Sequence, residues 1–258
     1  MHRFEQQSTG IPVLEMIRAL RTFSLVIWTA FCCGLALLLM ILRERWANWV
    51  LNRIGRDLWS CPIMRLIGTS DFKLEGPGAG SLPEHGIFIA NHTSFLDINA
   101  LYAFLRRPIV FLAKASIRKV PLLGPLNARV GTVFVERGNR EDSLRAVKAL
   151  EASFEKGRSI VVFPEGTRSK STEMLPFKKG AFHLAASAGV PVTPIYIEGM
   201  SSILPSGSFL ARRGKVRIYV GKEVWPSGTG SAAIHTFMKV AEKAVHDLKA
   251  FAQVDTLP

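Results

Sequence analysis

The chain has 258 residues and a formal net charge of +13 at pH 7, with 33 lysines and arginines against 20 acidic residues. This length allows one sizeable α/β domain with an additional segment, and 48% hydrophobic residues are too few for a polytopic membrane protein. The charge indicates an anionic partner, such as lipid head groups or an acidic carrier protein, unless it only aids solubility. Scattered basic residues without a nucleic-acid motif argue against nucleic acid.

An uncharged run of 20 residues, 23–42, stands near the N-terminus. As a helix it would be about 30 Å long, roughly the thickness of the hydrocarbon core of a bilayer. Arginines flank it on both sides in similar numbers, so the run predicts a membrane helix without fixing its orientation. A helix buried in a soluble core is the structural alternative. The cysteines, Cys32, Cys33 and Cys61, form no zinc or disulfide pattern and are interpreted as small buried hydrophobic residues in a reduced compartment.

Residues 46–67 mix tryptophan, leucine and isoleucine with arginine, a composition typical of an amphipathic helix at a membrane interface. We therefore predict that residues 1–75 form a membrane anchor and residues 76–258 a second domain. The protein is expected at a membrane, as a single-pass or a monotopic protein, with its second domain at the cytoplasmic face.

After a Gly/Pro-rich loop at 76–83, short apolar runs alternate with helical patterns, which predicts an α/β fold with a mixed or largely parallel sheet flanked by helices. The predicted strands are 86–90, 108–113, 132–135, 159–163, 192–197 and 216–220. The predicted helices are 94–105, 141–156, 177–188 and 232–251.

A seven-residue motif, NHTSFLD at 91–97, follows the first of these strands. A histidine suits the removal of a hydroxyl proton, and a carboxylate bonded to its second ring nitrogen would fix its tautomer. With His92 in a loop and Asp97 in the first helical turn, the two side chains can meet. The alternative is a capping box, in which Asp97 only satisfies backbone amides.

A second motif, FPEGTRS at 163–169, follows the strand predicted at 159–163. Ligands of open α/β sheets bind beyond the carboxyl ends of the strands, where both motifs are expected. Gly166 would let the backbone approach a ligand, Thr167 adds a hydroxyl donor, and Arg168 suits bidentate binding of phosphate. The alternative is a polar surface turn with an exposed arginine.

The chain resembles the glycerolipid acyltransferase family typified by 1-acylglycerol-3-phosphate acyltransferase. NHTSFLD matches the family's NHxxxxD pattern, and three further blocks follow in the family's order: GTVFVER at 131–137, preceded by KVPLLG, then FPEGTRS, then VPVTPI at 190–195. The segment PFKKG at 176–180 matches as well. The resemblance covers about residues 86–200, and Glu136 stands where the family often has Asp.

The resemblance implies a role for each matching residue. His92 would be the general base and Asp97 would orient it. The residues expected to bind the acceptor are Glu165, Gly166, Thr167, Arg168, Arg137, Lys114 and Pro194. Within this set, Arg137 would assist at the phosphate, Lys114 follows the second strand, and Pro194 would shape the floor of the site.

The implied reaction moves a fatty acyl group from acyl-CoA or acyl carrier protein to the free hydroxyl of 1-acyl-glycerol-3-phosphate, giving phosphatidic acid. A different acceptor, such as another lysophospholipid or a lyso-aminolipid, is the alternative within this class. A non-catalytic lipid-binding membrane protein is the alternative from another class. We expect no bound cofactor and no metal, because a thioester is already activated and the histidines are spread singly along the chain.

Overall fold

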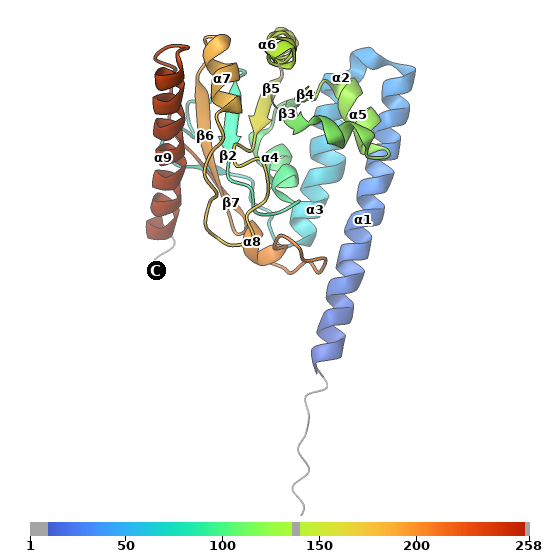
Figure 1. The fold of residues 1–258 in the computed structure, drawn as a ribbon. Coiled ribbons are helices and arrows are strands. Elements are labelled where there is room, and N and C mark those ends of the chain that lie inside the picture. Colours follow the sequence, from blue (N-terminus) through green and yellow to red (C-terminus); the bar gives the residue numbers. More distant parts are fainter. Residues whose placement is uncertain (1–9, 136–139, 256–258) are drawn as a thin grey trace, which may run out of the picture.

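The computed structural model describes residues 10–135 and 140–255, and a mostly parallel sheet forms the centre of this part of the chain. Its strand order is β1-β7-β6-β2-β5-β3-β4 (Figure 1). The strands are β1 (Leu74–Glu75), β2 (Ile87–Ala90), β3 (Ile109–Lys114), β4 (Val133–Val135), β5 (Ser159–Val162), β6 (Val192–Glu198) and β7 (Arg217–Val220). The predicted mixed sheet is confirmed. The two-residue β1 is too short for a strand pattern and was not predicted.

Parallel pairing joins β4, β3, β5, β2 and β6 in spatial order. β7 runs antiparallel to its neighbour β6, and β1 pairs in parallel with β7, so β1 and β7 both run opposite to the other five strands. All four residues of β2 and of β5 are buried, which explains why these strands are uniformly apolar rather than alternating. The carboxyl ends of the five parallel strands therefore meet at one edge of the sheet, which we call the carboxyl edge.

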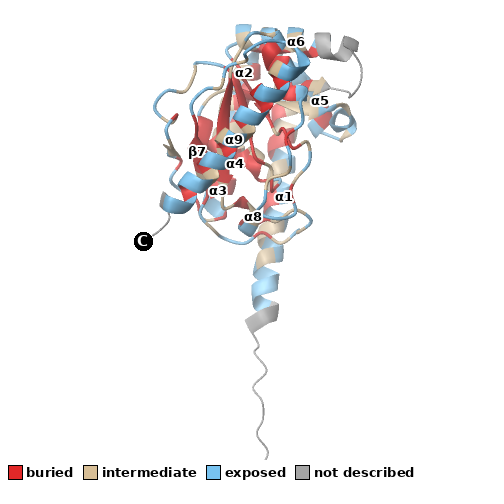
Figure 2. Ribbon diagram, turned by 60° about the vertical axis from the view of Figure 1, so that its left-hand side comes forward, coloured by how far each residue is buried: buried red, intermediate tan, exposed pale blue. Residues whose placement is uncertain are grey.

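Helices cover both faces of the sheet. One face carries α7 (Gly180–Ser187) and α9 (Ser231–Asp255), with α6 (Arg140–Glu155) beside α7 (Figure 1). The other face carries α3 (Cys61–Leu66) and α4 (Asp97–Leu105), and Figure 2 shows the buried strands between the two layers. Short helices complete the fold: η3 (Ala115–Lys119), α5 (Leu123–Val130) and α8 (Met200–Ile203).

The apolar N-terminal run lies in α1 (Gly10–Leu42), which is longer than the predicted helix at 23–42. Its arginines and Glu15 do not interrupt the helix, because isolated charges on an exposed turn are compatible with helical geometry. By length and hydropathy, Val13–Leu42 qualifies as a membrane span. The first turns of α1 project beyond the rest of the fold, whereas the later turns pack against it (Figure 1).

The predicted amphipathic stretch at 46–67 is helical. It comprises η1 (Glu44–Trp46), α2 (Ala47–Trp49), the π-helix η2 (Val50–Ser60) and α3. Trp28 of α1 donates its indole N–H to Leu58, and Trp59 donates to Thr29, both at 2.9 Å. One continuous hydrophobic core includes buried residues of α1, η2, the sheet and α9. The predicted anchor, residues 1–75, and the predicted second domain, residues 76–258, therefore contribute to one hydrophobic core.

Candidate active site

Both sequence motifs lie at the carboxyl edge of the sheet. Residues 91–97 follow β2, residues 163–169 follow β5, and these two strands are neighbours in parallel register. The two loops are bonded to each other, because the Ser169 N–H donates to the carbonyl of His92 at 2.8 Å. Strand order therefore brings together two segments that are about seventy residues apart in the sequence.

His92 and Asp97 form a close pair. The Nδ1 atom of His92 lies 2.8 Å from Oδ2 of Asp97, with the histidine in the loop and the aspartate at the first residue of α4. The same Oδ2 accepts the backbone N–H groups of Thr93 and Ser94 at 2.8 and 2.9 Å. The predicted contact is confirmed, and the same carboxylate also satisfies backbone amides, as the alternative interpretation expects. The role of the pair in catalysis stays a prediction.

The environment of the pair favours a fixed imidazole. Asp97 is fully buried, and its second oxygen, Oδ1, has no hydrogen-bond partner among the described residues. The His92 ring stacks on Phe163, with centroids 3.9 Å apart and planes inclined by 13°. An ionised carboxylate can only accept a hydrogen bond, so a neutral His92 bonded to it carries its proton on Nδ1 and keeps a free lone pair on Nε2. The side chain is 16% exposed, so it is not fully shielded from solvent.

Glu165 is buried, and both of its carboxylate oxygens contact the backbone. Its Oε1 accepts the N–H of His92 at 2.7 Å, and its Oε2 accepts the N–H of Leu175 at 2.8 Å. The residue is 1% exposed. Burial raises the pKa of Glu165, while the two backbone donors act in the opposite direction. Both carboxylate oxygens therefore already have backbone donors, and the expected contact with the acceptor stays a prediction.

Arg168 extends over an aromatic ring. Its guanidinium carbon lies 3.4 Å from the centroid of Phe95, a residue of the NHTSFLD loop whose side chain is 59% exposed. A guanidinium stacked in this way keeps its N–H groups in the plane, free to bind an anion. Next to it, Thr167 is exposed and Gly166 has a φ of +70°, a backbone conformation that favours glycine. Phe95 had no predicted role, because an aromatic residue in a loop gives no signal of its partner.

The remaining expected site residues lie further from the pair. Lys114 is exposed at the carboxyl end of β3, on the same edge of the sheet. Pro194 is buried within β6, where it pairs with Ile89 of β2, so it lies inside the sheet and not at its edge. Arg137 lies outside the described residues.

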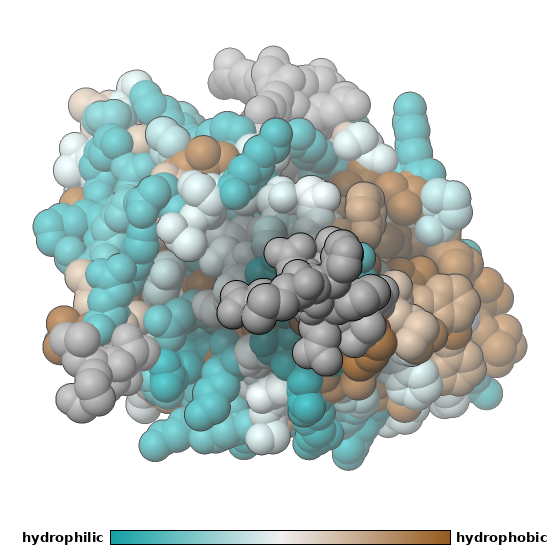
Figure 3. Space-filling view, turned by 90° about the horizontal axis from the view of Figure 1, so that it is seen from below, coloured by the Kyte–Doolittle hydropathy of each residue, from teal (hydrophilic) through white to brown (hydrophobic). Residues whose placement is uncertain are grey.

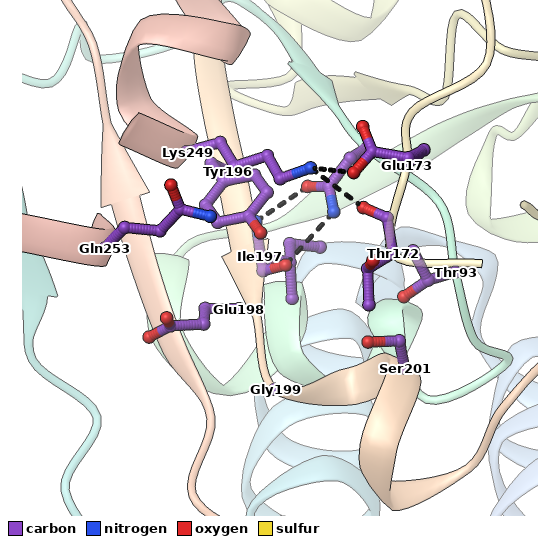
Figure 4. Close-up of a pocket in the computed structure, with 11 residues that line it drawn as sticks. Thr93, Thr172, Glu173, Tyr196, Ile197, Glu198, Gly199, Ser201, Lys249 and Gln253 are labelled. Atoms are coloured by element: carbon purple, nitrogen blue, oxygen red, sulfur yellow. Dashed lines mark hydrogen bonds and ion pairs between the residues drawn. The ribbon is translucent and has the colours of Figure 1, made fainter. Parts of the chain in front are cut away.

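A polar pocket of about 280 Å³ lies at the end of β6, where Asn91 and Thr93 of the NHTSFLD loop help to line it. It is lined by Thr93, Tyr196, Glu198 and Gln253, among others (Figure 4). Lys249 points into it and donates to Glu173 and to the carbonyl of Thr172 (Figure 4). No group of three or more His, Cys, Asp or Glu side chains suited to a metal ion occurs in the part of the chain that the structure describes.

A histidine–carboxylate pair lies at the carboxyl edge, and Phe95 of the same loop stacks on Arg168. These groups have the chemistry that general-base catalysis on an anionic substrate would need. Comparison with known proteins agrees with this class. A family model described as Acyltransferase matches residues 76–198. A 1-acyl-sn-glycerol-3-phosphate acyltransferase of Saccharomyces cerevisiae is 33% identical over 214 residues, which cover 81% of this chain and 69% of that protein. The chain therefore belongs to the acyltransferase family that includes the 1-acyl-sn-glycerol-3-phosphate acyltransferases, as the motifs predict.

Other relatives support the same assignment. A protein of that name from Chlamydomonas reinhardtii is 38% identical over 176 residues, covering 66% of this chain and 51% of the relative. The chain thus spans about half the length of this relative and of similar chloroplastic ones. The crystal structure of the 1-acyl-sn-glycerophosphate acyltransferase PlsC from Thermotoga maritima superposes with a TM-score of 0.70 at 26% identity, covering 93% of this chain and 98% of that one.

Proposed function

We propose that this protein transfers a fatty acyl group from a thioester donor to the free hydroxyl of 1-acyl-glycerol-3-phosphate, forming phosphatidic acid. The donor would be acyl-CoA or acyl carrier protein. The observation that carries the proposal is the 2.8 Å contact between His92 Nδ1 and Asp97 Oδ2 at the carboxyl edge. The names of the relatives support the choice of acceptor.

In the proposed reaction, Nε2 of His92 removes the proton of the acceptor hydroxyl as its oxygen attacks the thioester carbonyl carbon. Asp97 stabilises the imidazolium that forms, since its buried carboxylate already contacts Nδ1. The C–S bond then breaks, and the thiolate takes the proton back from His92. One ester and one free thiol result, so neither a metal nor a protein nucleophile is required.

For the acceptor we propose a phosphate site formed by Arg168 with Thr167 and the backbone at Gly166. Lys114 and Arg137 would add positive charge, and Pro194 would act only through the strand that carries it. We assign Glu165 a positioning role, because its carboxylate joins the His92 backbone to the loop at Leu175. A phosphate monoester carries more negative charge than the diester of a zwitterionic lysolipid, so a phosphate site at Arg168 would favour lysophosphatidic acid.

We propose that the N-terminal helix associates the protein with a membrane and lies within one leaflet as a monotopic anchor. Residues 1–75 would form the anchor and residues 76–258 the catalytic domain. Leu25, Cys32 and Met40 on the inner face of α1 are buried, and these three residues belong to the same hydrophobic core as the sheet, so a spanning helix would draw the rest of the fold into the hydrocarbon. We place the domain on the cytoplasmic side, where thiols stay reduced and thioester donors occur.

A transfer assay tests the function. Purified protein in mixed micelles receives radiolabelled acyl-CoA or acyl carrier protein, together with lysophosphatidic acid, another lysophospholipid or a lyso-aminolipid. We expect phosphatidic acid as the main product, and His92→Ala should lose it while remaining folded. Preference for another lysolipid would contradict the proposed choice of lysophosphatidic acid as the acceptor. Lipid binding without any acyl transfer would support the alternative of a non-catalytic lipid-binding protein.

A further inference from the structure

The loop between α8 and β7, residues 204–216, carries an unusual exposed aromatic side chain. Phe209 is 80% exposed, the largest fraction among the large hydrophobic side chains in the described ranges 10–135 and 140–255. Single exposed apolar residues are common at protein surfaces, so exposure alone carries no inference. The surroundings of Phe209 are what make it informative.

The loop is held against α1 and against the body of the protein. Arg21 of α1 donates to the carbonyl of Ala211, and the N–H of Ala211 donates to the hydroxyl of Thr22, both at 3.0 Å. Ala211 itself is fully buried, and the N–H of Arg212 donates to Ile203 at 2.8 Å. Phe209 is therefore presented on an ordered support, two residues from its attachment to the apolar helix.

The position of the loop matches that of the candidate active site. It begins after α8, which follows β6 directly, and so leaves the sheet at the carboxyl edge. In Figure 1 it reaches from α8 across to α1 at this end of the molecule. Seen from the same end, apolar side chains gather on the side of α1 while most of the remaining face is hydrophilic (Figure 3). The exposed apolar residues of α1 nearest to the Ala211 contact in sequence are Leu20 and Phe23.

Basic residues follow the aromatic side chain. Arg212, Arg213 and Lys215 are all exposed, and no acidic residue occurs between Phe209 and Arg217. An aromatic ring at the headgroup level, next to arginines that meet lipid phosphates, is the pattern by which protein segments bind an anionic membrane interface.

We propose that the loop around Phe209 is a second membrane-contact site, which inserts its aromatic ring into an anionic phospholipid surface beside α1. Two contacts with the bilayer would fix the rotation of the domain about the axis of α1. The carboxyl edge would then stay close to the lipid from which the acceptor is drawn. The proposal rests on the proposed membrane position of α1 and adds a site that the apolar N-terminal run does not contain.

Lipid quenching of a fluorescent label tests this site. Phe209→Cys in the full chain is labelled with an NBD fluorophore and reconstituted into vesicles of phosphatidylcholine and phosphatidylglycerol that carry a nitroxide lipid. The native cysteines are buried, and the unsubstituted protein measures their background labelling. The matched control is Trp225→Cys, which is 62% exposed and follows β7 beside the start of β6, at the opposite edge of the sheet.

We expect the label at 209 to be quenched at least twofold more than the label at 225. Charge reversal of Arg212 and Arg213 to Glu should reduce this difference in anionic vesicles. Equal quenching at 209 and 225 would overturn the proposal, provided that a label at Leu38→Cys on the exposed face of α1 is quenched. If the label at Leu38 also stays unquenched, the membrane position of α1 fails as well. Acyl transfer in micelles is measured separately. Failure of the proposed catalytic function can therefore be distinguished from failure of the Phe209 contact and from failure of the membrane position of α1.

Discussion

At the scale of single residues, His92 is held from several directions. Its ring contacts Asp97 and stacks on Phe163, and its backbone N–H and C=O are bonded to Glu165 and Ser169. A general base must be oriented before the substrate arrives, because reorientation during the reaction would raise the barrier. The contacts that fix the backbone matter for the proposed catalysis as much as the carboxylate on the ring.

Asp97→Asn should reduce kcat by about 10³- to 10⁴-fold while the protein stays folded. An asparagine amide facing Nδ1 would act as a donor and favour the tautomer in which Nε2 carries the proton. Steady-state transfer to lysophosphatidic acid measures the effect, and circular dichroism checks the fold. The double variant His92→Ala, Asp97→Asn should be no slower than His92→Ala, because the two residues act as one unit. A multiplicative loss would contradict the pairing.

Glu165→Gln should lower the free energy of unfolding by about 1–3 kcal/mol, because one acceptor oxygen is replaced by an amide that faces a backbone N–H. The melting temperature in detergent measures this, with Glu151→Gln on the exposed surface of α6 as the control. Activity should fall as well, because the His92 loop loses an attachment. An unchanged melting temperature together with a raised acceptor KM would restore the role expected from the motif.

The pH dependence of Glu165 has a defined sign. Burial raises the pKa of this carboxyl above its usual 4.5, so the folded protein binds the proton more tightly than the unfolded chain does. Its contribution to stability therefore falls as the pH rises from about 4.5 through the raised pKa. The wild-type melting temperature, taken relative to that of Glu165→Gln, should decline across this window. A rise across the same window would contradict the shift.

Phe95→Leu should raise the acceptor KM by about 2- to 30-fold, which corresponds to a cation–π contribution of about 0.5–2 kcal/mol. The value of kcat should stay nearly constant, since Phe95 acts through Arg168 and does not touch the reacting atoms. Phe95→Tyr keeps an aromatic face and should restore the KM. If kcat falls and the KM does not change, the stacking has no part in acceptor binding.

How far the sequence predicts this site depends on how local each contact is. The pair of His92 and Asp97 could be predicted because both lie in one motif at the end of a strand. The partners of Glu165 could not, because a backbone N–H such as that of Leu175 leaves no mark in the side-chain pattern. The contact between Arg168 and Phe95 depends on how two loops lie side by side.

At the scale of elements, the buried strands were predicted well because apolar runs bounded by loops have few alternatives. The helix predicted from residue 94 begins only at Asp97. The carboxylate of Asp97 accepts the N–H groups of Thr93 and Ser94, and the turn closed by these two hydrogen bonds stands in place of the first helical turn that was predicted. The start of α1 at Gly10 was also missed, since a search for uncharged residues stops at the first arginine.

The two faces of α1 should respond differently to substitution. Ala36 is 3% exposed on the inner face, so Ala36→Leu should overpack the core and cost about 1–3 kcal/mol of stability. Leu38 is 54% exposed on the outer face, so Leu38→Ala should change stability by less than about 0.5 kcal/mol. Melting temperatures in detergent compare the two variants. Equal losses would mean that both faces of α1 pack inside the protein.

At the scale of the whole molecule, the N-terminal segment and the sheet cannot be separated. β1 pairs with β7, and the core that contains Met40 of α1 also contains Ile89 of β2. The apolar outer face of α1 and the carboxyl edge are therefore fixed relative to each other. Under the proposed function, a lipid substrate would be received by a site whose distance from the bilayer is set by the fold, and the net charge of +13 would favour an anionic surface.

This arrangement predicts the membrane topology. A helix that packs along the domain from Arg21 to Met40 cannot cross the bilayer unless polar residues of the domain enter the hydrocarbon, which is strongly unfavourable. The start of α1 and the domain should therefore lie on the same side. Cysteines introduced at Glu15 and at Lys222, both exposed, should react with a membrane-impermeant maleimide from one side of sealed vesicles. Labelling of the two positions from opposite sides would require α1 to detach from the core and span the membrane.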